Sequence, residues 1–175
     1  MDLKKFIRDI PDFPKPGIIF KDITPLLKNS EAFLNAIEQL SAHFRDSRII
    51  SIAGVESRGF IIGAAMAFKL NCGFIPLRKP GKLPYKTKSV TYDLEYGTDT
   101  VEIHIDAVKE GEKVLLIDDL IATGGTAEAA VKLIARAGGN VTASSFVIEL
   151  PELGGRQRLE ALDIEVLSLC SFEGH

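Results

Sequence analysis

Apolar residues recur along this chain in alternating strand-like and helix-like patterns. Short apolar runs bounded by turn residues predict strands at residues 49–53, 73–77, 114–117 and 141–148. The period of an amphipathic helix instead marks residues 59–70 and 126–137. Because strands and helices take turns, the pattern predicts an α/β fold with a central, mostly parallel sheet that is flanked by helices on both faces.

The N-terminal part of the chain follows a different pattern. Apolar residues at helical spacing predict a first helix that carries Leu3, Phe6, Ile7 and Ile10. Prolines then punctuate an extended segment as far as Pro25, in which residues 17–20 form the strand-like piece. A second helix is predicted from Ser30, a residue type that caps helix N-termini, with a buried side formed by Phe33, Leu34, Ile37, Leu40 and Phe44.

A third pattern separates the strands predicted at 73–77 and 114–117. Polar and apolar residues alternate at 89–94 and 100–105, on either side of Gly97, which predicts an exposed antiparallel hairpin. The loops that begin at Gly54, Arg78 and Asp118 each follow a predicted parallel strand. We therefore expect them to converge at the edge where open α/β sheets bind ligands.

Composition excludes several classes of protein for this chain. With 175 residues, 46% of them hydrophobic, it has enough material for one domain with its own core. A net charge of −3 argues against a nucleic-acid partner. The chain has no long apolar span or signal-like start, and its two cysteines, Cys72 and Cys170, fit reduced core thiols. We expect a cytoplasmic protein with no membrane partner.

The most informative stretch lies at residues 114–126. An apolar run leads into Asp118 and Asp119, then into small residues that include Gly124 and Gly125, and then into an amphipathic helix. Glycines let backbone N–H groups approach an anion, and a helix N-terminus attracts one, so the loop fits a phosphate. Carboxylates cannot bind the phosphate itself. They suit the hydroxyls of an attached sugar or a metal ion bound to it, which makes phosphate plus ribose the natural ligand.

An ordinary strand-to-helix turn with a solvated acidic pair is the alternative interpretation of that stretch. Either Asp-Asp or Gly-Gly alone would favour this alternative, but the uninterrupted order of the whole stretch favours the ligand site. Two better-known phosphate motifs, G-x-x-x-x-G-K-[ST] and G-x-G-x-x-G, do not occur in the chain. His43, His104 and His175 lack the spacing of metal ligands.

Residues 117–126 resemble the phosphoribosyl-diphosphate binding motif of the type I phosphoribosyltransferases. Four other stretches narrow the resemblance to the adenine-specific branch of this family: residues 11–25, 56–60, 78–84 and 94–97. The resemblance covers essentially the whole chain. It implies an N-terminal base-binding hood at about residues 1–28 and a flexible catalytic loop at about residues 79–100 in a single domain, residues 1–175.

The resemblance also implies site residues. Glu95 would be the catalytic carboxylate that serves the purine, Tyr96 would cover the site, and Asp118 and Asp119 would hold the ribose. Diphosphate would bind at Glu56 and Ser57, joined by a cis peptide, with positive charge from Arg58, Arg78, Lys79 and Lys82. The 5-phosphate would bind at Ala122, Thr123, Gly124, Gly125 and Thr126. The base would lie against Ile19, Phe20, Lys21 and Leu120, and would be read by the main chain of residues 19–21.

The implied function is purine salvage by a homodimer: adenine and 5-phospho-α-D-ribose 1-diphosphate give AMP and diphosphate. Mg²⁺ is implied as a cofactor, held mainly by substrate oxygens and water, without a dedicated protein metal site. Two alternatives remain open. One is an enzyme for hypoxanthine, guanine, xanthine or orotate, and the other is a non-catalytic module that senses phosphoribosyl diphosphate.

Overall fold

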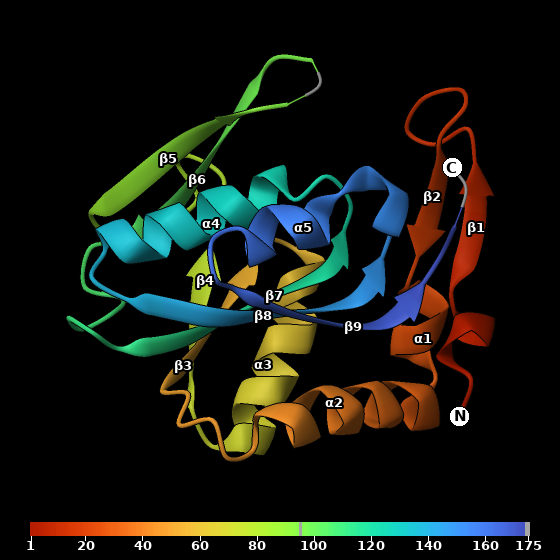
Figure 1. Cartoon of the computed structure of the whole chain (residues 1–175), viewed down its shortest axis with the longest axis horizontal. Coiled ribbons are helices and arrows are strands. Elements are labelled where there is room, and N and C mark those ends of the chain that lie inside the picture. The colour runs from red at the N-terminus through yellow and green to blue at the C-terminus, as the bar shows by residue number, and fades with distance from the viewer. Residues whose placement is uncertain (95, 174–175) are drawn as a thin grey trace.

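A parallel sheet of five strands forms the centre of the computed structural model, which describes residues 1–94 and 96–173 (Figure 1). Its order is β4-β3-β7-β8-β9. The strands are β3 (Ser51–Val55), β4 (Gly73–Leu77), β7 (Lys113–Ile121), β8 (Asn140–Glu149) and β9 (Glu165–Ser171). The predicted parallel sheet is thus confirmed, but the sequence pattern missed β9, in which Ser168 and Ser171 interrupt the apolar run.

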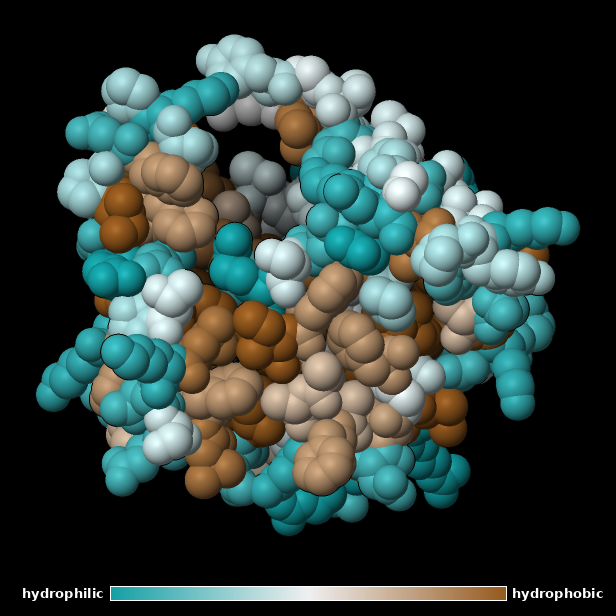
Figure 2. All heavy atoms as spheres, turned by 180° about the vertical axis from the view of Figure 1, so that it is seen from behind, coloured by the Kyte–Doolittle hydropathy of each residue, from teal (hydrophilic) through white to brown (hydrophobic). Residues whose placement is uncertain are grey.

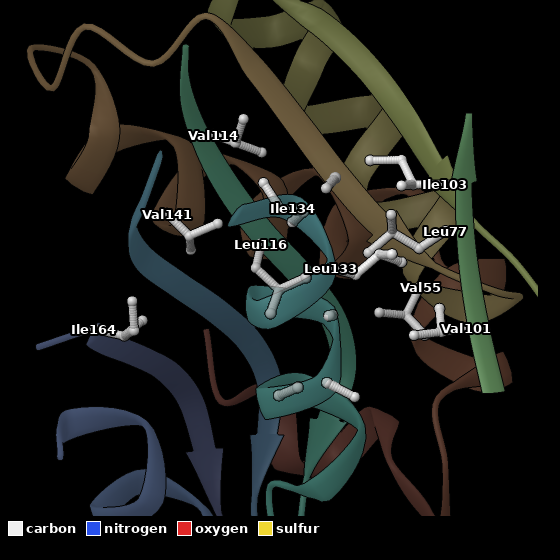
Figure 3. Packing of buried hydrophobic residues seen from close by; sticks show 14 of the residues in the cluster. Val55, Leu77, Val101, Ile103, Val114, Leu116, Leu133, Ile134, Val141 and Ile164 are labelled. Carbon is white, nitrogen blue, oxygen red and sulfur yellow. The ribbon is translucent and has the colours of Figure 1, made fainter. Parts of the chain in front are cut away.

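Helices cover both faces of this sheet, as the alternating pattern predicts. One face packs against α3 (Arg58–Leu70), with α2 (Ser30–Phe44) beside it, and the other packs against α4 (Gly125–Arg136) and α5 (Gly155–Glu160) (Figure 1). The sheet divides the core accordingly. Val114 and Leu116 of β7 join the cluster under α4 (Figure 3). Leu115 and Ile117 of the same strand join the cluster under α2 and α3. Because successive side chains point to opposite faces, a continuous apolar run is what such a strand requires.

The first predicted helix is wrong beyond its first turn. The chain forms a short 3₁₀ helix, η1 (Leu3–Phe6), and then the strand β1 (Arg8–Pro11), which pairs antiparallel with β2 (Ile19–Asp22). Ile10 lies opposite Phe20 in this pair. Proline disfavours helical backbone in the preceding residue, so Pro11 keeps Ile10 extended. A short helix, α1 (Thr24–Lys28), then leads into the body of the protein.

The second helix begins where predicted, but its cap is one residue earlier. The side chain of Asn29, not Ser30, accepts the backbone N–H of Ala32 at 2.9 Å, which satisfies one of the free donors of the first turn. Leu34 is 59% exposed and does not belong to the buried side, which Ile37, Leu40 and Phe44 form as predicted.

The predicted hairpin is confirmed as β5 (Thr87–Asp93) paired antiparallel with β6 (Thr98–His104). It packs against α4 through Val90, Val101 and Ile103, which are buried. Its base joins the central sheet through a bridge between Arg78 and Glu102.

Both cysteines are free thiols. Cys170 is buried in the core, as expected, while Cys72 is only partly buried, and burial raises the pKa of each thiol. Within residues 1–94 and 96–173, no helix is both long and apolar enough to span a bilayer.

Candidate active site

The loops after β3, β4 and β7 meet at one edge of the sheet, as the strand order requires. Val55 at the end of β3 lies opposite Leu77 at the end of β4, and the N–H of Glu56 donates to the carbonyl of Leu77 at 3.0 Å. One boundary differs from the prediction. β7 continues to Ile121, so Asp118 and Asp119 lie inside the strand rather than in the loop, because β8 pairs with this stretch as well.

Three cavities open at this edge, and Asp118 lines all of them. Their volumes are about 500, 200 and 180 Å³. Seen from behind, the surface of the molecule has a hollow between the β1–β2 pair and the β5–β6 hairpin (Figure 2). In the order of these volumes, we call the three spaces the large cavity, the basic cavity and the loop cavity.

The large cavity has mostly apolar walls, and the predicted base-binding residues lie there. Ile19, Phe20, Lys21 and Leu120 all line it, together with Arg58, Asp119 and Ala122. The sequence analysis missed the rest of the wall: Gly17, Ile18, Leu150 and Leu153. The signal available for Leu150 was its place directly after β8, at the edge where ligands bind.

Lys21 turns its side chain away from the large cavity. Its ammonium donates to Asp9 Oδ1 at 2.7 Å and lies 4.4 Å from the centre of the Phe172 ring. The residue is buried, so this pairing satisfies a cation that water does not reach. Its charged group is therefore engaged with Asp9 and Phe172 rather than free to bind a ligand.

The loop cavity matches the predicted phosphate loop. All five predicted residues line it: Ala122, Thr123, Gly124, Gly125 and Thr126. Gly124 has a φ of +81°, a conformation that favours glycine, and α4 begins directly after it. The free N–H groups of the first turn of α4 and the positive end of its dipole therefore face this space.

The basic cavity collects the predicted diphosphate residues Glu56, Arg78 and Lys79, with Thr126 at its border. Glu56 Oε1 accepts the N–H of Lys79 at 2.6 Å and lies 3.3 Å from Arg78 Nε. The ammonium of Lys79 pairs with Asp99, a residue that the sequence analysis missed. Glu56 and Asp99 thus hold Arg78 and Lys79 in fixed positions on the wall of this cavity.

Three predicted residues, Ser57, Lys82 and Tyr96, do not line these cavities, and a fourth is not described. The peptide bond between Glu56 and Ser57 is cis, as the resemblance implies, but Ser57 itself is exposed. Lys82 is exposed and lines none of the three cavities. Tyr96 is 75% exposed, with the ammonium of Lys15 4.8 Å from its ring centre. Glu95, the expected catalytic carboxylate, lies outside the described residues.

The acidic pair divides into two different environments. Asp119 is buried, and its carboxylate accepts a hydrogen bond from Arg58, whose guanidinium stacks 5.3 Å from the centre of the Phe20 ring. Asp118 Oδ1 accepts the N–H of Asp119 at 2.8 Å. Burial, and then the charge of Asp119, raise the pKa of Asp118 well above its ordinary value. A carboxyl perturbed in this way at a cavity junction is typical of functional sites.

The described residues hold no group of three or more His, Cys, Asp or Glu side chains that could bind a metal ion. His43 instead contacts Glu165 at 2.5 Å, and His104 accepts the N–H of Tyr85 at 3.3 Å.

Comparison with known proteins relates both the sequence and the structure to one family. Residues 26–167 match the family described as the phosphoribosyl transferase domain. An adenine phosphoribosyltransferase of Parvibaculum lavamentivorans is 70% identical over 175 residues, which cover 100% of both chains.

Two solved structures extend this similarity to the fold. The adenine phosphoribosyltransferase of Thermoanaerobacter pseudethanolicus is 50% identical, with a TM-score of 0.94 over 98% of each chain. That of Saccharomyces cerevisiae, complexed with an imino-altritol bisphosphate and adenine, is 39% identical, with a TM-score of 0.90 over 96% of each chain.

Proposed function

Because the chain belongs to the adenine phosphoribosyltransferase branch of the phosphoribosyltransferase family, we propose that its reaction takes place where the three cavities meet. This branch forms AMP from adenine and 5-phospho-α-D-ribose 1-diphosphate in purine salvage. The observation that carries this proposal is that Asp118 lines all three. Adenine would occupy the large cavity, the diphosphate the basic cavity, and the 5-phosphate the loop cavity. The anomeric carbon, to which base and diphosphate bind in turn, then lies beside Asp118.

Asp118 and Asp119 hold the ribose hydroxyls in this arrangement. The bonds that form and break share the anomeric carbon, so the transition state resembles an oxocarbenium ion, as in glycoside hydrolysis. A carboxylate nearby balances the positive charge that develops on the sugar. Arg58, the first residue of α3, donates a hydrogen bond to Asp119 and so keeps its carboxylate oriented.

The leaving diphosphate is stabilised by positive charge from two loops. Arg78 and Lys79 line its cavity, and the exposed Lys82 follows on the same loop, at about residues 79–100, which closes over the site. The first N–H groups of α3, at Ser57 and Arg58, add partial positive charge. Mg²⁺ brought in with the substrate would supply further charge neutralisation; the residues fit this role, since Glu56 and Asp99 already pair with Arg78 and Lys79.

The base is held by the N-terminal hood at about residues 1–28 and by Leu120. Main-chain groups of residues 19–21 read its polar edge, while Ile19 and Phe20 pack against the ring. Glu95 transfers the proton of the purine ring nitrogen, and Tyr96 covers the site. An assay of the purified protein with adenine, hypoxanthine, guanine, xanthine and orotate tests this assignment, and turnover of a different base in preference to adenine would contradict it.

A homodimer would bury the apolar face that α3 presents to solvent. Ile61 and Phe68 on this helix are 46% and 90% exposed, and apolar residues gather over it in Figure 2. Large exposed apolar patches mark interaction sites, so a second copy of the chain is the proposed occupant. Sedimentation should show a dimer for the native protein and for Leu162→Lys, and a monomer for Phe68→Lys. A native monomer would contradict the proposal.

The proposed location is the cytoplasm. Free thiols at Cys72 and Cys170 suit a reducing compartment. With a net charge of −3, no nucleic-acid partner is proposed.

A further inference from the structure

The segment that follows β8 lines the large cavity and also contacts the backbone of the phosphate loop. Leu150 and Leu153, the latter at the end of the 3₁₀ helix η2 (Pro151–Leu153), line the large cavity. Gly155, the first residue of α5, donates its N–H to the carbonyl of Ala122 in the phosphate loop at 2.9 Å. A Cβ on Gly155 would lie 2.4 Å from that carbonyl oxygen, so the two backbones are in close contact. Residues 150–155 thus connect the wall of the large cavity to the phosphate loop.

An ion pair joins the two residues that flank this segment, Glu149 and Arg156. Glu149 is the last residue of β8 and is 5% exposed. Arg156 donates to it twice, from Nε to Oε1 at 2.8 Å and from Nη2 to Oε2 at 2.5 Å. This two-bond geometry fixes direction as well as distance, which a single bond does not.

Two residues of β9 hold the ion pair to the sheet. Arg156 Nη1 donates to the carbonyl of Val166 at 2.6 Å, and Ser168 Oγ donates to Glu149 Oε2 at 2.5 Å. The hydrogen bond from Arg156, and then that from Ser168, hold the pKa of Glu149 below its ordinary value. The pair therefore stays charged at neutral pH, without touching any of the three cavities.

We propose that Glu149 and Arg156 are positioning residues for phosphoribosyl transfer. They clamp residues 150–155 between the sheet and the phosphate loop, and this sets the separation of the adenine and 5-phosphate subsites. The inference rests on the proposed placement of adenine in the large cavity and of the 5-phosphate in the loop cavity. Contacts remote from the reacting atoms can set substrate affinity in this way, since a loss of binding that is equal in the ground and transition states raises KM and leaves kcat nearly unchanged.

Steady-state kinetics of three variants test the clamp. Arg156→Met should raise KM for adenine and for phosphoribosyl diphosphate by about tenfold or more, with kcat within about threefold. Arg156→Lys keeps the charge but loses the two-bond geometry, so its KM values should fall between those of the native and Met proteins. Lys69→Met, which removes the exposed pair with Glu38 on distant helices, is the matched control and should leave both KM values unchanged.

A double variant separates positioning from stability. Arg156→Met leaves a buried carboxylate without its partner and should lower Tm, whereas Glu149→Met with Arg156→Met removes both charges and should restore Tm. The proposal requires that KM stays raised in the double variant. Recovery of native KM together with Tm would overturn it. Leu153→Ala checks the placement independently, because an unchanged KM for adenine in that variant would contradict the placement rather than the clamp.

Discussion

The guanidinium of Arg58, at the start of α3, donates a hydrogen bond to the buried carboxylate of Asp119, in the middle of β7. These residues lie 61 positions apart in the chain, so the pair connects a helix and a strand of the site that are distant in sequence. Asp119 pairs with the guanidinium of Arg58, while burial and the charge of Asp119 raise the pKa of Asp118. The two carboxyl groups of the acidic pair therefore lie in different electrostatic surroundings.

Removal of both charges should impair the reaction without unfolding the protein. Asp118→Asn with Asp119→Asn should lower kcat/KM by about 10²-fold or more, a loss of about 2.7 kcal/mol of transition-state stabilisation. Circular dichroism should show an intact fold. Near-native kcat/KM in a folded double variant would contradict the role of the pair.

Ionisation of the Asp118 side chain should make the folded protein less stable at neutral pH. A raised pKa in the folded state means that the folded protein binds this proton more tightly than the unfolded chain. Its contribution to stability is therefore greatest below the ordinary pKa of an aspartate and is lost as pH rises through the raised value. Asp118→Asn should raise Tm by a few degrees at pH 7, since about 1 kcal/mol corresponds to about 2–4 °C at this size.

The same comparison at lower pH provides the check. The Tm difference between Asp118→Asn and the native protein should shrink towards zero as pH falls towards the ordinary aspartate pKa. Glu149 has a lowered pKa, so its contribution is lost as pH falls, and both proteins should lose stability together in acid. A Tm gain that does not depend on pH would show that ionisation of Asp118 is not its cause.

Glu95 is expected to act on the proton of the base. Glu95→Gln should depress kcat far more than it weakens the binding of phosphoribosyl diphosphate, measured by calorimetry. Glu31→Gln, an acid in the first turn of α2, serves as the control and should change neither quantity. Equal losses in turnover and binding would indicate a structural role for Glu95.

Base selection should not depend on the side chain of Lys21. Adenine and hypoxanthine present donor and acceptor in opposite order, so a main-chain N–H and C=O pair can accept one and reject the other. We expect a preference for adenine of at least about 10³-fold in kcat/KM, because the wrong base leaves buried polar groups unpaired. Lys21→Met should keep this ratio, since the ammonium faces Asp9 and Phe172. A collapse of the ratio would mean that the side chain reads the base.

Patterns that are local in sequence predicted most of the fold. The apolar run at 114–117, the glycines that follow and the period of the next helix all act within one stretch, and they yielded β7, the phosphate loop and α4. The strand that continues through Asp118 and Asp119 escaped prediction because pairing with β8 fixes its end. Likewise, β1 depends on its partner β2, and four apolar residues at helical spacing indicate a helix when that partner is not considered.

The site was predicted where a motif is contiguous and was missed where the walls come from elsewhere. Ala122 to Thr126 line the loop cavity as expected, since one loop places them all. Leu150, Leu153 and Asp99 reach the cavities only through the packing of distant segments. A leucine carries no chemical signal of its own, so only the place of Leu150 directly after a predicted strand could have indicated it, and Asp99 lies in a predicted hairpin that carries other acidic residues as well.

The antiparallel pair β1–β2 lies in a part of the chain that is separate in sequence from the phosphate loop and the acidic pair. The match to the phosphoribosyl transferase domain begins at residue 26, after this pair has ended at Asp22. The proposed sites for the sugar phosphate therefore lie within the matched part, while residues 17–21, which line the proposed base cavity, precede it. Substitutions among the first 25 residues can retune which base is accepted while the phosphate loop and acidic pair stay unaltered, so this terminus is the natural place for evolution, or an engineer, to create a new preference.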